Sequence, residues 1–185
     1  MTKTKKITTS AIMIALSAVL VIISKLIPAP WLQGGSITFA SMVPIIIASL
    51  LLGTKWGLLS GFVFSLIQMM TGFYPPPTQT FLYFILVVLL DYTIAFGVLG
   101  LANFFYKLFN EKIWAIPLSG IIVTALRYIC HIISGVLIWG VYREEGQGVW
   151  AYSLTYNGSY MIPEIIITGV VLVLLSKFIK KQINK

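Results

Sequence analysis

Residues 79–106 read QTFLYFILVVLLDYTIAFGVLGLANFFY, an apolar and aromatic stretch in which Asp91 is the only charged side chain. The stretch exceeds the roughly 20 residues that a helix needs to cross the hydrocarbon core of a bilayer. Three successive prolines at positions 75–77 precede it, and such a run cannot lie inside a helix. These residues therefore predict a long membrane-spanning helix over 79–106.

The rest of the chain has the same character, since 58% of its 185 residues are hydrophobic and only 10% are charged. That composition is far more apolar than an ordinary soluble domain. We predict an all-α membrane protein, a single domain over residues 1–185 that forms a bundle of six transmembrane helices in a lipid bilayer. The predicted helices cover residues 7–27, 38–52, 56–71, 79–106, 113–141 and 150–178.

The basic residues predict the orientation of the bundle. Six spans place both termini on one side, and lysine and arginine collect on the cytoplasmic side of membrane proteins. Ten of the thirteen basic residues fall on the side of the termini, so the net charge of +8 indicates topology and does not indicate nucleic-acid binding. Both termini are therefore expected in the cytoplasm. The ten residues are Lys3, Lys5, Lys6, Lys55, Lys107, Lys112, Lys177, Lys180, Lys181 and Lys185.

This orientation places three aromatic loops outside: residues 28–37 with Trp31, residues 73–78 with Tyr74, and residues 142–150. Tryptophan and tyrosine are frequent at membrane interfaces and in ligand sites. Most of these aromatic residues are expected to be interface anchors, while Trp31 is a candidate for closing over a ligand.

Four ionisable residues stand out deep inside predicted helices, where a charge costs at least ~2.5 kcal/mol and needs a partner or a water-filled cavity. They are Asp91, Arg127, His131 and Glu164. At about 1.5 Å per residue, Asp91 and His131 lie roughly 18 and 15 Å below the outer helix ends. Arg127 and Glu164 both lie roughly 21 Å below them. We expect an Arg127–Glu164 ion pair beneath a ligand-facing Asp91 and His131. The alternative is that all four satisfy one another within the bundle.

Two helix faces carry polar and aromatic residues near this depth. His131, Gly135 and Trp139 recur every four residues, so one helix would present an imidazole, a gap and an indole to one side. A second face has the i, i+3, i+7 pattern of Asn157, Tyr160 and Glu164. A carboxylate beside aromatic faces would suit a flat, nitrogen-rich or cationic small molecule. Packing within the bundle is the alternative.

Two stretches carry a family resemblance. Residues 127–142, RYICHIISGVLIWGVY, and residues 152–158, YSLTYNG, resemble the thiamine-specific substrate-binding (S) components of energy-coupling-factor (ECF) importers, the ThiT/YuaJ family. The resemblance includes residues 89–96, LLDYTIAF, and the six-helix pattern. It implies an ECF S-component-like bundle in a bacterial cell membrane that binds thiamine under its first outer loop and needs no cofactor.

The resemblance also implies roles for individual residues. His131 and Tyr152 resemble the family's hydrogen-bonding partners of the ligand, and Trp139 resembles its stacking indole. Asp91 stands where glutamate is expected in the family. Its side chain is shorter, so a water molecule or a helix shift would be needed to bridge the carboxylate to the ligand. The predicted substrate-binding set is Asp91, Tyr92, His131, Gly135, Trp139, Tyr152, Asn157, Trp31 and Glu164.

Small residues on helix 7–27 predict a docking face. Ala11, Ala15 and Ala18 stand at i, i+4 and i+7, which lets another helix approach closely. The family docks such a face on its coupling subunit, so the resemblance implies an ECF transmembrane coupling subunit and two cytoplasmic ATPase subunits as partners. Packing inside the bundle is the alternative, and it is the preferred interpretation for Gly57 and Gly61.

The sequence contains no GxxxxGK[ST] phosphate loop, no HExxH zinc motif and no GxSxG nucleophile motif. The chain is therefore predicted not to be an enzyme, with ATP hydrolysis expected on the partner subunits. Three alternatives stay open. They are a self-sufficient ion-coupled vitamin transporter that uses intramembrane acids as proton carriers, an S component for another vitamin, and a structural subunit without a ligand.

Overall fold

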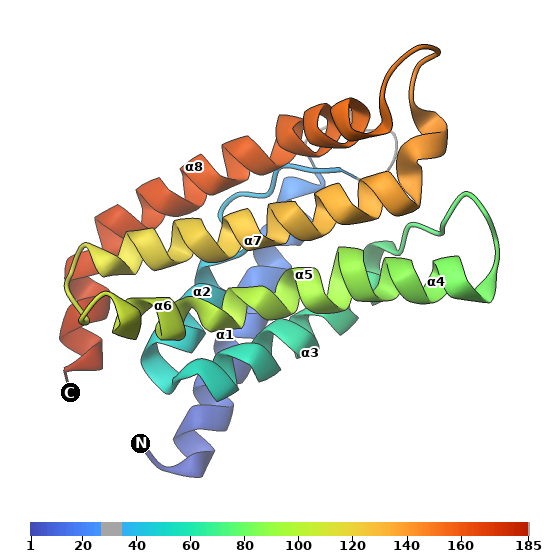
Figure 1. The fold of residues 1–185 in the computed structure, drawn as a ribbon. Helices are drawn as coiled ribbons and strands as arrows, with labels where there is room; N and C mark the ends of the chain where they lie inside the picture. Colours follow the sequence, from blue (N-terminus) through green and yellow to red (C-terminus); the bar gives the residue numbers. More distant parts are fainter. Residues whose placement is uncertain (27–34, 185) are drawn as a thin grey trace.

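The computed structural model describes residues 1–26 and 35–184, and every regular element within them is helical. The helices pack as a bundle (Figure 1). In chain order they are α1 (Lys3–Ser24), α2 (Val43–Leu52), α3 (Thr54–Gly72), the continuous rod from α4 to α6 (Phe81–Leu108), α7 (Ala115–Leu137) and α8 (Val149–Ile183). The predicted all-α fold with six helices is therefore confirmed for the described residues.

Four of these helices, α1, the rod Phe81–Leu108, α7 and α8, are long and apolar enough to cross a membrane. The 10-residue α2 is too short to do so. Its residues are apolar all round and nearly all buried, which is the pattern of a helix enclosed by its neighbours. The 19-residue α3 carries more polar residues and does not reach the same apolar character.

The outside of the bundle is apolar. Ile12 and Leu16 on α1, Ile129 on α7 and Leu174 on α8 are all exposed. Soluble monomers rarely expose apolar surface of this extent, whereas a lipid bilayer covers it. The two ends of the chain lie toward the same end of the bundle, opposite the loops at residues 73–80 and 143–148 (Figure 1). This arrangement matches an even number of membrane crossings by the chain.

The rod Phe81–Leu108 changes its helical type along its length. It consists of α4 (Phe81–Val87), the π-helix η1 (Val88–Thr93), α5 (Ile94–Gly97), the 3-10 helix η2 (Val98–Leu101) and α6 (Ala102–Leu108). π-helical turns are rare in proteins, and those that occur often lie at functional sites. The π-turn contains Asp91, which is the only charged residue of Val88–Thr93.

Glycines allow α3 to cross this rod at close range. A Cβ added to Gly61 would lie 2.4 Å from the backbone oxygen of Phe96, and one added to Gly100 would lie 2.2 Å from the backbone nitrogen of Leu58. Gly57 meets Gly100 in the same crossing, because a Cβ there would lie 2.8 Å from its oxygen. The packing interpretation of Gly57 and Gly61 is therefore confirmed.

The predicted start of the second helix at residue 38 is wrong, because α2 begins at Val43. Pro44 lies in the first turn, where its missing N–H breaks no helical hydrogen bond. Ala40 has a φ of 58°, which a right-handed helix does not contain. The backbone N–H of Thr38 donates to the Glu164 carboxylate, so this segment is held by α8 and lies outside any helix.

Other helix ends also differ from the prediction. α7 stops at Leu137 and not at 141, because Ile138 leaves the helical conformation with φ −121° and ψ −52°. α8 continues to Ile183 and not only to 178, and its last turn carries Lys180 and Lys181. Cations at this end interact favourably with the helix dipole, which supports the extension. α1 begins at Lys3 and not at 7, since the Thr2 side chain caps it.

Candidate functional site

A cavity of about 160 Å³ lies between α1, α3, the π-turn, α7 and α8. Six of the nine residues predicted to bind substrate line it. They are Asp91, Tyr92, His131, Trp139, Tyr152 and Asn157. The structure therefore brings together most of the site that the sequence predicts, from four helical segments: the π-turn, α7, the 3-10 helix after α7, and α8.

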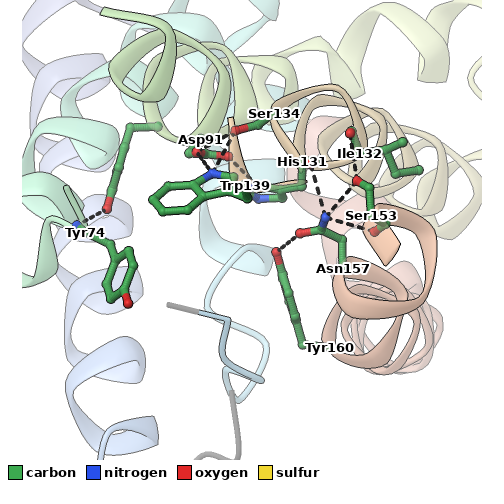
Figure 2. Close-up of polar contacts among 10 residues, drawn as sticks. Tyr74, Asp91, His131, Ile132, Ser134, Trp139, Ser153, Asn157 and Tyr160 are labelled. Carbon is green, nitrogen blue, oxygen red and sulfur yellow. Dashed lines mark hydrogen bonds and ion pairs between the residues drawn. The ribbon is translucent and has the colours of Figure 1, made fainter. Parts of the chain in front are cut away.

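The Asp91 carboxylate is the centre of the polar contacts (Figure 2). Its Oδ1 lies 3.1 Å from Nδ1 of His131. Its Oδ2 accepts a hydrogen bond from the Ser134 hydroxyl at 2.7 Å and one from the Trp139 indole N–H at 3.0 Å. The predicted proximity of Asp91 and His131 is confirmed. The role of Ser134 was not predicted, although its i+3 spacing from His131 on α7 is a usable signal.

The π-turn brings the directions of two successive residues closer together than a regular α-helix does. Successive residues of an α-helix point about 100° apart. A π-turn has more residues in each turn, so neighbours diverge less. Asp91 and Tyr92 occupy this turn, and both line the cavity.

His131 is buried, with 7% of its surface exposed. Its Nδ1 contacts Asp91, whereas its Nε2 has no hydrogen-bond partner within residues 1–26 and 35–184. The backbone oxygen of His131 accepts a hydrogen bond from the Asn157 side chain at 3.2 Å. The imidazole is thus held on one side and leaves one nitrogen for another group.

Asn157 joins α8 to α7 (Figure 2). Its Nδ2 donates to the backbone oxygens of His131 and Ser153, at 3.2 and 2.9 Å. Its Oδ1 accepts a hydrogen bond from the Tyr160 hydroxyl at 2.5 Å. The Ser153 hydroxyl donates to the backbone oxygen of Ile132 at 2.8 Å. Asn157 therefore positions the Tyr160 ring at the cavity wall as well as lining the cavity itself.

Trp139 does not share an α-helical face with His131, and that part of the prediction is wrong. α7 ends at Leu137, and Trp139 begins the 3-10 helix η3 (Trp139–Tyr142). The change of helical type still directs the indole to Asp91. Tyr74, from one of the loops whose aromatic residues are mostly expected to be interface anchors, lines the cavity, with its ring centroid 5.4 Å from that of Trp139.

Two tyrosines use their hydroxyls differently. The Tyr92 hydroxyl accepts from the backbone N–H of Tyr74 at 2.9 Å and donates to the backbone oxygen of Gly72 at 3.1 Å. It therefore holds the loop after α3 at the cavity. The Tyr152 hydroxyl is buried with no hydrogen-bond partner in the described part of the chain, and its ring stacks on Tyr156 at 5.7 Å between centroids. Tyr152 can therefore offer its hydroxyl to a ligand.

Gly135 does not line the cavity. A Cβ added there would lie 2.1 Å from Oγ of Ser153 and 2.9 Å from Nδ2 of Asn157. The gap that the glycine leaves is filled by α8, so it does not accommodate a flat ring as predicted. Its role is close packing of α7 against α8.

The predicted Arg127–Glu164 ion pair does not form among the described residues. Arg127 lines the cavity with its guanidinium carbon 4.2 Å from the centre of the Phe96 ring, and its Nη1 contacts Met42. Glu164 is 1% exposed, lies outside the cavity lining, and accepts the N–H of Thr38. The segment before α2, predicted as helical, supplies Met42 as the partner of Arg127 and Thr38 as the partner of Glu164. The two side chains therefore contact this segment and not each other.

The lining carries charges of both signs. Asp91 is accompanied by Arg127 and by Lys25, whose Nζ donates to the backbone oxygen of Thr71 at 2.9 Å. Attraction of an organic cation therefore depends on the aromatic faces as well as on the carboxylate. The predicted ligand-closing residue Trp31 lies outside the described residues.

The small residues of α1 divide into two groups. Ala11 and Ala15 are exposed, whereas Ala18 is half-buried and packs against the core. The buried face of the helix carries Ser17 and Val21 instead. Packing inside the bundle therefore accounts for Ala18 and leaves Ala11 and Ala15 on the outer surface.

An apolar helical bundle that encloses a small polar and aromatic cavity defines a membrane protein that accommodates a small ligand. The family profile described as "Thiamine transporter protein (Thia_YuaJ)" matches residues 7–184. The chain is 36% identical over 177 residues to "Thiamine transporter ThiT" of Bacillus subtilis. The aligned region covers 89% of this chain and 86% of that protein. The chain belongs to the thiamine transporter family.

Two further comparisons agree with this assignment. ThiT of Lacticaseibacillus paracasei is 37% identical over 92 residues, which cover 45% of this chain and 46% of that protein. The solved structure of ThiT from Listeria monocytogenes has the same fold, with a TM-score of 0.73, 22% identity and 98% of each chain covered. The predicted fold class, a bundle like that of the ThiT family, is therefore confirmed.

Proposed function

We propose that the chain is the thiamine-binding S component of an ECF-type importer in a bacterial cell membrane. The observation that carries the proposal is the convergence of Asp91, His131 and Trp139 on one cavity in a member of the thiamine transporter family. Thiamine combines a flat aminopyrimidine with a cationic thiazolium ring. An indole face can stack on the first, and aromatic faces attract the second.

The outer surface of α1 supports the proposed partners. Ala11 and Ala15 are exposed side by side on an apolar helix, and small residues let a second helix approach its backbone. We assign this face to the transmembrane coupling subunit, and ATP hydrolysis to two cytoplasmic ATPase subunits. The count of basic residues supports an orientation with both termini in the cytoplasm and the mouth of the cavity outside.

Isothermal titration of the purified chain with thiamine tests the proposal. We expect saturable heat at micromolar ligand or below, together with quenching of tryptophan fluorescence, because Trp139 lines the cavity. Riboflavin and biotin serve as control ligands, since an S component for another vitamin would respond to its own ligand. No response to thiamine at micromolar concentration would overturn the proposal.

One observation favours a second function, that of an ion-coupled transporter that works alone. Asp91, His131 and the buried Glu164 all lie in membrane-spanning segments, where ionisable residues often carry protons. Proteoliposomes that contain only this chain decide between the two. Thiamine uptake driven by a proton gradient would support the transporter, whereas a strict requirement for partner subunits would support the S component.

A further inference from the structure

We propose that Asp91 is a positioning residue that fixes His131 in the Nδ1–H tautomer, so that Nε2 presents a hydrogen-bond acceptor to the ligand. The site then selects a ligand that donates an N–H at this point, as the exocyclic amine of an aminopyrimidine does. The identity of that ligand rests on the proposed function. The tautomer is a property of the ligand-free chain and is tested separately.

The first step concerns Nδ1. A carboxylate accepts hydrogen bonds, so the 3.1 Å contact between its Oδ1 and Nδ1 of His131 assigns the hydrogen to that ring nitrogen. Asp91 also accepts from Ser134 and Trp139, which is consistent with a pure acceptor. The hydrogen bond made by one imidazole nitrogen decides the state of the other. Asp91 therefore places a hydrogen on Nδ1 of His131.

The second step concerns Nε2, which is buried and has no partner within the described residues. A protonated imidazole would place a charged N–H donor there without an acceptor, and this costs more than an unused lone pair. The guanidinium of Arg127 lines the same cavity and disfavours a second positive charge. Both effects oppose the attraction of the Asp91 carboxylate for a charged ring, and we infer that they keep the ring neutral, with Nε2 as an acceptor.

The third step concerns Asp91 itself. Its Oδ1 is used by His131, and its Oδ2 is used by Ser134 at 2.7 Å and by Trp139 at 3.0 Å. These contacts use three of the roughly four acceptor sites of the carboxylate and orient two cavity-lining rings. One side chain thereby sets the hydrogen-bonding character of the imidazole and the position of the indole.

The chain contains a single histidine, so ring-¹⁵N labelling of histidine reports on His131 alone once any polyhistidine tag is removed. Protonated and unprotonated ring nitrogens resonate far apart, and their couplings to the ring protons identify which is which. In the ligand-free chain in nanodiscs we expect a protonated Nδ1 and an unprotonated Nε2. A hydrogen on Nε2, in either the neutral or the charged ring, would overturn the inference.

Two variants separate positioning from general structure. Asp91→Ala removes the acceptor for Nδ1–H, so we expect a measurable population with the hydrogen on Nε2. Ser134→Ala disturbs the same carboxylate but leaves the contact between Oδ1 and Nδ1, so the tautomer should not change. An unchanged tautomer in folded Asp91→Ala would contradict the proposal. If that variant does not fold, the spectrum of the unmodified chain still decides.

Ligand analogues supply an independent test. Oxythiamine carries an oxo group in place of the exocyclic amine, so we expect it to bind roughly tenfold or more weakly than thiamine. Equal affinities would overturn the inference but leave the proposed function intact. Failure of thiamine itself to bind would overturn the proposed function, and the tautomer result would still stand.

Discussion

The indole N–H of Trp139 donates to Oδ2 of Asp91 at 3.0 Å and to Oγ of Ser134 at 3.1 Å. Trp139 begins the 3-10 helix that follows α7, whereas Asp91 lies in the π-turn of the rod Phe81–Leu108. The orientation of the ring therefore depends on a carboxylate from a different membrane span. Regular helical geometry is interrupted on both sides of this contact.

Replacement of Trp139 should therefore act in two stages. Trp139→Phe keeps an aromatic face but loses the N–H, so thiamine affinity should fall by about 1 kcal/mol, the typical value of one hydrogen bond. Trp139→Ala also removes the stacking surface and should cost ~1–3 kcal/mol. Calorimetric titration measures both. Trp150→Phe is the matched control, because Trp150 is 59% exposed and lies outside the cavity lining.

An order of effects in which Trp139→Phe is as damaging as Trp139→Ala would contradict a stacking role for the ring. Equal affinity of Trp139→Phe and the unmodified chain would show that the hydrogen bond to Asp91 does not position the indole for the ligand. In either outcome, thermal unfolding of the variants without ligand shows whether the fold has changed.

The helix depths estimated from sequence placed Asp91 near His131, although the outer end assumed for His131 was residue 141 and α7 ends at Leu137. The i, i+3, i+7 face of Asn157, Tyr160 and Glu164 was equally predictable, and all three residues are buried. Both inferences use geometry within a single regular helix or its length. The sequence therefore identified the rod Phe81–Leu108, α7 and α8 as helices that face the cavity, but not α1 or α3, which also line it.

Contacts made by irregular segments could not be predicted in this way. Residues 38–42 lie before α2 and not within it, and Thr38 and Met42 contact the Glu164 and Arg127 side chains that were expected to pair. Pro44 was an available signal for the later helix start, since proline is favoured in the first turn. The place of Gly135 depends on which neighbour fills the space beside it, and the helical period alone does not determine that neighbour.

Gly135→Ala should weaken the bundle. The new Cβ would lie 2.1 Å from Oγ of Ser153 on α8, so the two helices must separate or the serine must move. Overpacking of this kind typically costs about 1–3 kcal/mol, which should appear as a lower melting temperature in detergent. Gly97→Ala is the control, because a Cβ there meets nothing within 4 Å and alanine favours a helix.

A melting temperature for Gly135→Ala equal to that of the unmodified chain would contradict close packing at this position. Loss of thiamine binding with no loss of stability would instead favour direct contact between Gly135 and the ligand, as the sequence predicted.

Glu164 should act on the bundle more than on the ligand. Its carboxylate accepts the backbone N–H of Thr38 and is outside the cavity lining. Glu164→Ala leaves that buried N–H without its acceptor and should destabilise the chain by about 1–3 kcal/mol. Glu164→Gln keeps an amide oxygen as acceptor and should retain thiamine affinity within about twofold, since it alters no lining side chain.

Thermal unfolding and calorimetric titration of the same preparations measure the two effects. The interpretation fails if Glu164→Gln loses thiamine binding while its melting temperature is unchanged, because the carboxylate would then contact the ligand. It also fails if both variants unfold at the temperature of the unmodified chain.

The exposed alanines of α1 provide a test of docking that leaves the cavity untouched. Ala11→Leu and Ala15→Leu add an isobutyl group to the outer face, which keeps a second helix from approaching the backbone. Uptake of labelled thiamine by cells with their own coupling and ATPase subunits should fall, while thiamine affinity of the purified variants should stay within about twofold.

Ala151→Leu is the matched control, because Ala151 is also exposed but lies at the start of α8 and not on α1. It should leave both uptake and affinity unchanged. Normal uptake by Ala11→Leu and Ala15→Leu would remove α1 as the docking face, and equal loss in all three variants would indicate a general effect of bulk in the membrane. Only a loss of uptake that is confined to the two α1 variants ties transport to this helix. The α1 variants and the control each add the same isobutyl group to an exposed alanine, so they differ only in the helix that carries it.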